Sequence, residues 1–130
     1  MALLIDTCII IDYLRDNSKI DLSKEEILIN PVVELEILQG VRNKREQKDA
    51  LRLMESFGHV EYSTECFNLA KILILRYSLS HSLKLPDALI AASCLIYDVP
   101  LWTYNIKDFA YIEGMKIYQE GSIDDKLQEA

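Results

Sequence analysis

Four carboxylates that are far apart in the sequence occupy positions where a compact α/β fold could gather them. They are Asp6, Glu36, Asp87 and Asp108. Several carboxylates in one cleft repel one another unless a divalent cation neutralises them, and Mg²⁺ typically takes one or two carboxylates together with waters and a substrate phosphate. Such an ion lowers the pKa of bound water and offsets the charge that develops on a phosphate in transit. The residue types therefore favour metal-dependent hydrolysis of a phosphate ester.

Each acid also has a purely structural interpretation. Asp6 could cap the first helix, and Asp87 could be an ordinary charge in the first turn of another helix. Glu36 could lie on a solvated helix face, where Glu34 offers an equivalent choice. Asp108 could be a turn residue. Only the four acids considered together favour a metal site.

The elements that must position these acids alternate between strand and helix. The apolar run Ala2–Ile5 is followed by Asp6 and a helical pattern through Leu14, which predicts a strand and then a capped helix. Further strands are expected at Glu26–Asn30, His59–Tyr62, Leu101–Tyr104 and Met115–Tyr118. Helices are expected at Pro31–Gln39, Asn43–Phe57, Thr64–Tyr77 and Asp87–Tyr97, with a polar connection at Ser78–Lys84 and a short turn or helix at Ile106–Tyr111.

This alternation is typical of an α/β layer fold with a largely parallel sheet. In such sheets, ligands bind beyond the carboxyl ends of the strands. Asp6 directly follows one expected strand, and Asn105 and Asp108 follow another in the same way. Asp87 lies in the first turn of the most apolar helix, where the helix dipole favours a carboxylate. The predicted fold therefore explains how acids so distant in sequence could meet.

The composition narrows the class of protein. The chain has 130 residues, half of them hydrophobic, which suits one domain over residues 1–118 followed by a polar tail at 119–130. Its net charge of −7 rules out binding of nucleic acid by bulk electrostatics, so action on a polyanion needs a local basic patch, a metal ion or both.

The cellular compartment follows from what the sequence lacks. Nothing resembles a membrane span, because no apolar run approaches roughly 20 residues. The opening MALLID is too short for a signal peptide and lacks its basic flank. The three cysteines are odd in number and widely spaced among apolar neighbours. This pattern indicates reduced thiols in the core. We therefore expect a cytoplasmic protein.

Four segments carry a resemblance to a known family. They are LLIDTCIIIDYLR, VVELEILQG, LKLPDALIAASCLIYDVPLWTYNIKDF and YIEGMKIY, which follow one another from Ala2 to Tyr118. Together they resemble the PIN-domain ribonucleases, and specifically the VapC-type toxins of toxin–antitoxin pairs. In the second segment the family's acid stands four residues before a glycine, which selects Glu36 before Gly40 and leaves Glu34 as the runner-up.

The resemblance implies a three-layer α/β/α sandwich around a mainly parallel sheet, and hydrolysis of RNA phosphodiesters that depends on Mg²⁺ or Mn²⁺. It implies a homodimer, for which apolar residues near Ile37–Val41 and Leu69–Leu75 would provide a surface. It also implies a cognate antitoxin whose C-terminal segment covers the active cleft.

By position, the resemblance makes Asp6 and Asp87 the best metal ligands and Glu36 the third acid. The family often has an acid where this chain has Asn105, so Asp108 could take the fourth position, and one or two metal ions remain possible. Thr7, Thr103 and Asn105 would orient water or a carboxylate beside the metal, whereas Asp12 is interpreted as surface charge.

Contacts to RNA could come from the basic run Arg42–Arg45 and from Arg15, Lys84 and Lys107, although Lys44–Lys48 could equally be a solvated helix start. Among the aromatic residues near the last motif, Tyr104 could stack on bases, whereas Trp102 and Phe109 fit the core better. His59 and His81 lie in no motif, so a general-base histidine is not expected.

Two other functions fit the same residues. A magnesium-dependent phosphohydrolase of a small substrate would use the same carboxylates in a closed pocket. A non-catalytic binding domain of the same fold would have kept the acids for structural reasons, and Asn105 in place of an acid favours that alternative. Metal dependence and dependence on polymer length separate the three hypotheses.

Overall fold

The central sheet has four parallel strands in the order β3-β2-β1-β4. The computed structural model describes residues 1–18 and 20–119. The strands are β1 (Ala2–Ile5), β2 (Glu26–Ile29), β3 (Gly58–His59) and β4 (Leu101–Trp102). Leu3 lies opposite Ile27 on one side of β1, and Leu4 lies opposite Leu101 on the other. The first strand is therefore a central one, which explains why its residues 3–5 are fully buried.

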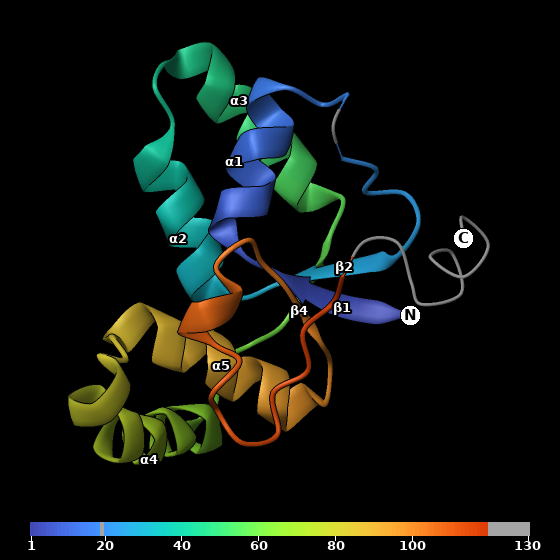
Figure 1. Ribbon diagram of the computed structural model, residues 1–130. Helices are drawn as coiled ribbons and strands as arrows, with labels where there is room; N and C mark the ends of the chain where they lie inside the picture. The colour runs from blue at the N-terminus through green and yellow to red at the C-terminus, as the bar shows by residue number, and fades with distance from the viewer. Residues whose placement is uncertain (19, 120–130) are drawn as a thin grey trace.

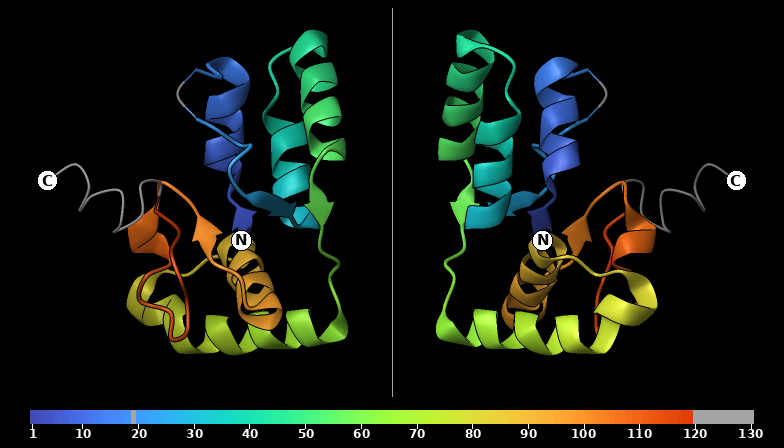
Figure 2. Two further views of the ribbon diagram at one scale, coloured as in Figure 1. Left: turned by 90° about the vertical axis from the view of Figure 1, so that its right-hand side faces the viewer. Right: turned by 90° about the vertical axis from the view of Figure 1, so that its left-hand side faces the viewer.

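The part of the chain that the structure describes has five α-helices. They lie over the two faces of the sheet, as Figures 1 and 2 show. The first face carries α1 (Thr7–Arg15), α2 (Pro31–Gly40) and α3 (Lys44–Glu55). The opposite face carries α4 (Thr64–His81) and α5 (Leu85–Tyr97), and the short 3-10 helix η1 (Ile106–Asp108) follows β4. The expected three-layer α/β/α sandwich with a parallel sheet is confirmed.

Side-chain caps start the helices where the sequence predicts. Asp6, Asn30, Asn43 and Ser63 each accept a hydrogen bond from a backbone N–H of the first turn of α1, α2, α3 and α4. Such caps satisfy donors that have no partner within the helix. Since Asp6 and Asn30 directly follow β1 and β2, both helices begin at the carboxyl edge of the sheet.

Two expected boundaries are wrong. The segment Met115–Tyr118 is not a full strand: it makes a single parallel bridge, between Leu101 and Ile117, after a turn at Gly114. The expected connection Ser78–Lys84 is helical as far as His81, because α4 meets no glycine or proline and ends only at Ser82, which takes a left-handed φ of 58°.

The strand expected at His59–Tyr62 lies earlier, at Gly58–His59. A Cβ at position 58 would lie 2.6 Å from Cδ2 of Leu28 on the neighbouring strand, so a larger residue there would require the Leu28 side chain to shift. Glycine therefore permits the close approach of β3 to β2. The two other expected strands are shorter than predicted, because Asn30 caps α2 and Thr103 turns away from the sheet.

The remaining expectations concern the thiols, the membrane and the tail. All three cysteines are free, with Cys66 and Cys94 buried and Cys8 partly exposed. Among the described residues, no helix is long and apolar enough to cross a membrane. Apart from Gln119, the expected polar tail lies outside the described residues.

Candidate active site at the carboxyl edge of the sheet

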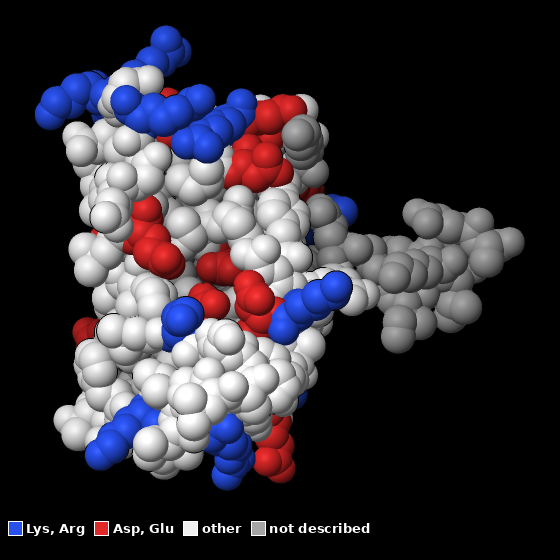
Figure 3. Space-filling view, turned by 60° about the vertical axis from the view of Figure 1, so that its left-hand side comes forward, with Lys and Arg blue, Asp and Glu red and all other residues white. Residues whose placement is uncertain are grey.

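A cleft of about 570 Å³ opens at the carboxyl ends of β1 and β4, between α1, α2 and the start of α5. Ten residues line it: Asp6, Thr7, Cys8, Ile11, Asp12, Arg15, Glu36, Asp87, Tyr104 and Asn105. Figure 3 shows acidic side chains gathered in the middle of one face of the molecule, with basic side chains at the end above them. The cleft is the place where the fold rule expects a ligand.

Asp6 is both a helix cap and a cleft residue, so the two interpretations of this acid are compatible. Its Oδ1 accepts a hydrogen bond from the backbone N–H of Thr7 at 2.8 Å. Its Oδ2 accepts one from the hydroxyl of Thr103 at 2.7 Å. The side chain is 7% exposed, and two donors therefore fix a nearly buried carboxylate at the base of the cleft.

Glu36 and Glu34 point in different directions from α2. Glu36 lines the cleft, and its Oε1 accepts a hydrogen bond from the hydroxyl of Thr7 at 2.9 Å. Glu34 instead lies beside the ring of His59, with Oε2 at 3.8 Å from Nδ1. Of the two candidate glutamates, Glu36 is the one that the fold brings to the other acids.

Asp87 has the clearest electrostatic signature of the cluster. Burial raises its pKa, and the nearby carboxylates of Asp6, Asp108 and Glu36 raise it further, to about 6. The four predicted acids are thus close enough to act on one another. Asp108 is exposed on η1 and does not line the cleft, whereas Asn105 does.

The interpretation of Asp12 as surface charge is wrong. Asp12 lines the cleft, and one of its oxygens, Oδ2, accepts a hydrogen bond from the hydroxyl of Tyr104 at 2.6 Å. One face of α1 carries Cys8, Asp12 and Arg15, because residues three and four apart lie on the same side of a helix. No local signal could have placed Asp12 in the cleft, because Cys8 was expected in the core and Tyr104 is distant in sequence.

Thr103 connects the base of the cleft to its rim. Its hydroxyl donates to Asp6 and accepts a hydrogen bond from the backbone N–H of Asn105 at 3.0 Å, and the residue is buried. The side chain thereby holds the carboxylate of Asp6 and the turn after β4 in one arrangement. This contact agrees with the orienting role expected for Thr103.

We expect Thr103→Val to lower the free energy of unfolding by about 2 kcal/mol, because the substitution removes the hydroxyl donor to Oδ2 of Asp6 and the acceptor of the Asn105 backbone N–H. Thr103→Ser keeps the hydroxyl and should cost only about 1 kcal/mol for the lost methyl group. Urea denaturation of both variants measures the difference. Equal stability of the two variants would contradict the role of the hydroxyl.

The donor chemistry of the cleft suits a hard divalent cation. A cation near Asp87 would relieve the repulsion that raises the pKa of its carboxyl. Within residues 1–18 and 20–119, no three His, Cys, Asp or Glu side chains converge closely enough to hold an ion by themselves. Mg²⁺ commonly needs only one or two carboxylates besides water and substrate, so the acids present fit such an ion.

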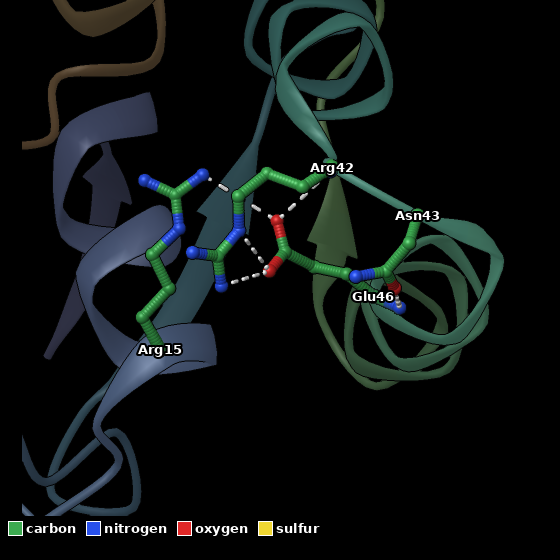
Figure 4. A network of polar contacts seen from close by, with 4 residues as sticks. All are labelled: Arg15, Arg42, Asn43 and Glu46. Carbon is green, nitrogen blue, oxygen red and sulfur yellow. Dashed lines mark hydrogen bonds and ion pairs between the residues drawn. The ribbon is translucent and has the colours of Figure 1, made fainter.

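Figure 4 shows a polar network around Glu46, a buried glutamate that sequence reasoning missed, and this network includes Arg15 of the cleft lining. Glu46 on α3 accepts hydrogen bonds from Nε and Nη2 of Arg42 at 3.1 and 2.8 Å, and its Oε1 lies 3.5 Å from Nη2 of Arg15. The hydrogen bonds from Arg42 lower the pKa of Glu46, which keeps it ionised. Part of the expected basic run is therefore an ion-pair network, and Asn43 within the run caps α3.

Most of the chain matches known proteins. A model of the PIN domain matches residues 3–114. Ribonuclease VapC of Rickettsia bellii is 31% identical, covering 90% of this chain and 95% of that protein. Ribonuclease VapC1 of Methanocaldococcus jannaschii is 28% identical, covering 91% of this chain and 88% of the relative.

Solved structures agree in fold. A toxin–antitoxin complex from Klebsiella pneumoniae superimposes with a TM-score of 0.73 at 25% identity, covering 91% of this chain and 99% of the other. VapBC2 from Rickettsia felis, solved bound to a DNA fragment from its promoter, gives a TM-score of 0.73 at 19% identity over 91% and 98% of the two chains. With the acids gathered where the sequence motifs predict and the family model spanning nearly all of the described residues, the chain belongs to the PIN domain family.

Proposed function

We propose that this protein is an endoribonuclease of the VapC type, dependent on Mg²⁺ or Mn²⁺, and the toxin of a toxin–antitoxin pair. The observation that carries the proposal is the meeting of Asp6, Glu36 and Asp87 in one cleft, with the pKa of Asp87 raised to about 6 by burial and by the other acids. The similarity to curated ribonucleases over nine-tenths of the chain supports the reaction class.

In this proposal, Asp6 and Asp87 would hold the ion, which would supply a lowered pKa for bound water and positive charge opposite the phosphate. The hydrogen bonds from Thr7 and Thr103 fix the Asp6 carboxylate before the substrate arrives. Oε1 of Glu36 accepts a hydrogen bond from the Thr7 hydroxyl, so the other carboxylate oxygen is the one available to hold water or accept a proton.

The fourth position of the site is divided between two residues. Asn105 lines the cleft and can donate or accept a hydrogen bond there. Asp108 acts on Asp87 through its charge, which raises the pKa of the Asp87 carboxyl. We propose that Asn105 orients water or a phosphate oxygen, and that Asp108 adds the negative charge that attracts the cation.

The proposed partners are a cognate antitoxin, whose C-terminal segment covers the cleft, and a second copy of the chain. Solved neighbours are toxin–antitoxin complexes, which supports the first partner. Ile37, within one of the two expected dimer surfaces, is buried, whereas α4 exposes Ile72, Leu75 and Leu79. The exposed apolar residues of α4 therefore support contact with a second copy of the chain better than the segment around Ile37 does. We also propose that the protein acts in the cytoplasm.

Incubation of the purified chain with a mixed RNA pool tests the activity. We expect cleavage with Mg²⁺ or Mn²⁺, none with chelator, and products with 5′-phosphate and 3′-hydroxyl ends. Dinucleotides and simple phosphate esters should react far more slowly, because the cleft is open and suits a polymer. Cleavage that persists in chelator would contradict metal dependence, and rapid turnover of small esters would favour the small-substrate alternative.

A further inference from the structure

We propose that Tyr104 and Arg15 form a nucleotide subsite in the cleft, in which the Tyr104 ring stacks on a base of single-stranded RNA and the Arg15 guanidinium binds a phosphate. The proposal rests on the proposed ribonuclease function and adds to it a place for the strand beside the scissile phosphate. Both residues line the same cleft as Asp6 and Asp87.

Tyr104 is an aromatic residue presented to solvent at the rim of an active cleft. It is 54% exposed, in contrast to Trp102 and Phe109 of the same segment, which are buried in the core. Its hydroxyl donates to Asp12 at 2.6 Å, and this contact ties the turn after β4 to α1. An aromatic ring can stack on any base, so this contact does not depend on the RNA sequence. The hydrogen bond from the hydroxyl to Asp12 fixes the ring before the base arrives.

Arg15 supplies positive charge to the same cleft, from the last residue of α1. It lies three residues beyond Asp12 on α1, and its side chain is 39% exposed. Glu46 is shared by Arg15 and Arg42, so the three side chains together carry one excess positive charge. In a protein of net charge −7, this cation beside the acidic cleft is a local attraction for a phosphate.

Arg15 is also better positioned than a lone surface arginine. Glu46 is 9% exposed and is itself held by the backbone and side chain of Arg42, so it gives the Arg15 guanidinium a fixed partner. The contact at 3.5 Å uses only one of the nitrogens of Arg15. Its remaining N–H donors can therefore bind a phosphate oxygen while the ion pair stays in place.

The order of these residues along α1 indicates the path of the RNA strand through the cleft. Asp6 precedes the helix and Arg15 ends it, which separates them by about 13 Å at 1.5 Å per residue. The contact of Tyr104 with Asp12 lies between these ends. RNA would thus run from the acids past the Tyr104 ring to Arg15, and from there toward the basic side chains at the end of the molecule in Figure 3.

Binding of fluorescently labelled single-stranded oligoribonucleotides tests the subsite. All proteins carry Asp87→Asn, so that the RNA stays intact, and the dissociation constant is measured by anisotropy over a range of salt concentrations. Tyr104→Leu should weaken binding about 5- to 100-fold with an unchanged salt dependence, because a stacking contact is lost. Arg15→Gln should instead reduce the slope of log K against log salt by about 0.7, because one phosphate contact is lost.

Matched controls separate stacking from general surface effects. Tyr104→Phe keeps the ring and should retain most of the affinity and the quenching of a 2-aminopurine base, which Tyr104→Leu should abolish. Tyr97→Leu removes a tyrosine that is 44% exposed on α5, and Arg52→Gln removes an exposed arginine on α3. Neither change should alter affinity or salt slope.

Two results would overturn the subsite, and they are distinguishable. If the Asp87→Asn protein binds RNA but Tyr104→Leu and Arg15→Gln bind it equally well, the strand takes another path and the ribonuclease proposal is unaffected. If the Asp87→Asn protein binds no RNA and the wild type cleaves none, the proposed function and the subsite are both wrong. Thermal unfolding of each variant verifies that the fold is retained.

Discussion

Replacing Asp87 by Asn is expected to abolish RNA cleavage and, at the same time, to make the metal-free protein more stable at pH 8. The variant loses a proposed metal ligand, and we expect the rate of cleavage to fall at least about 100-fold, the usual scale for loss of a group that acts in the transition state. It also loses a carboxylate whose ionisation opposes folding, because burial and three neighbouring acids raise its pKa to about 6.

The sign of the effect follows from proton binding. Between its ordinary pKa of 3.8 and the folded value of about 6, Asp87 holds its proton more tightly in the folded protein than in the unfolded chain. The contribution of Asp87 to the stability of the metal-free wild type therefore falls as the pH rises through this window and is least favourable above about pH 7. This difference in pKa corresponds to a loss of at most about 3 kcal/mol in the free energy of unfolding. Because Asp87 is partly exposed, we expect a loss of about 1–2 kcal/mol.

Urea denaturation in chelator at pH 4 and pH 8 measures this effect. Wild type and Asp87→Asn should be similar at pH 4, and the variant should be more stable at pH 8. Added Mg²⁺ should stabilise the wild type more than the variant, because binding to the folded state shifts the equilibrium. Asp49→Asn on the exposed side of α3 is the control and should show neither change. A wild type more stable than Asp87→Asn at pH 8 in chelator would contradict the repulsion among the acids.

The layered fold could be predicted from the sequence because local signals agreed with one another. Pro31 after an apolar run starts α2 where expected, and the apolar segment Asp87–Tyr97 forms most of the buried helix α5. The elements at the sheet edge were harder to predict. The segment Met115–Tyr118 alternates like a strand, yet it pairs with Leu101 alone because β4 itself is only two residues long.

The candidate site was predictable where a residue follows a strand and unpredictable where a residue depends on tertiary packing. Asp6 and Asn105 follow β1 and β4, so strand ends bring them to the cleft. Glu46 lies four residues after Arg42, so that ion pair is local, but the burial of Glu46 and its contact with Arg15 depend on the packing of α1 beside α3. Asp12 was missed for the same reason, since its partner Tyr104 is distant in sequence.

The choice between the two glutamates of α2 gives the second large prediction. Glu36→Gln should reduce RNA cleavage at least about 100-fold, because the amide removes a negative charge from the cleft and cannot accept a proton from water. Its Oε1 can still accept the hydrogen bond from Thr7, so the fold should be retained. Glu34→Gln is the matched control two residues away, and it should change cleavage by less than about two-fold.

Both variants remove one negative charge from α2 and differ only in the side of the helix that loses it. Their comparison therefore isolates the effect of the charge that faces the cleft. Glu34 contacts His59 at the far side of the helix, at 3.8 Å and with both side chains well exposed, so its loss should have little effect on stability as well. Single-turnover cleavage of one RNA under saturating Mg²⁺ compares the rates directly. If Glu34→Gln were the inactive variant, the spacing to Gly40 would have selected the wrong acid. If both variants cleaved like the wild type, two aspartates would suffice for the reaction, and Glu36 would serve only to hold Thr7 at the start of α1.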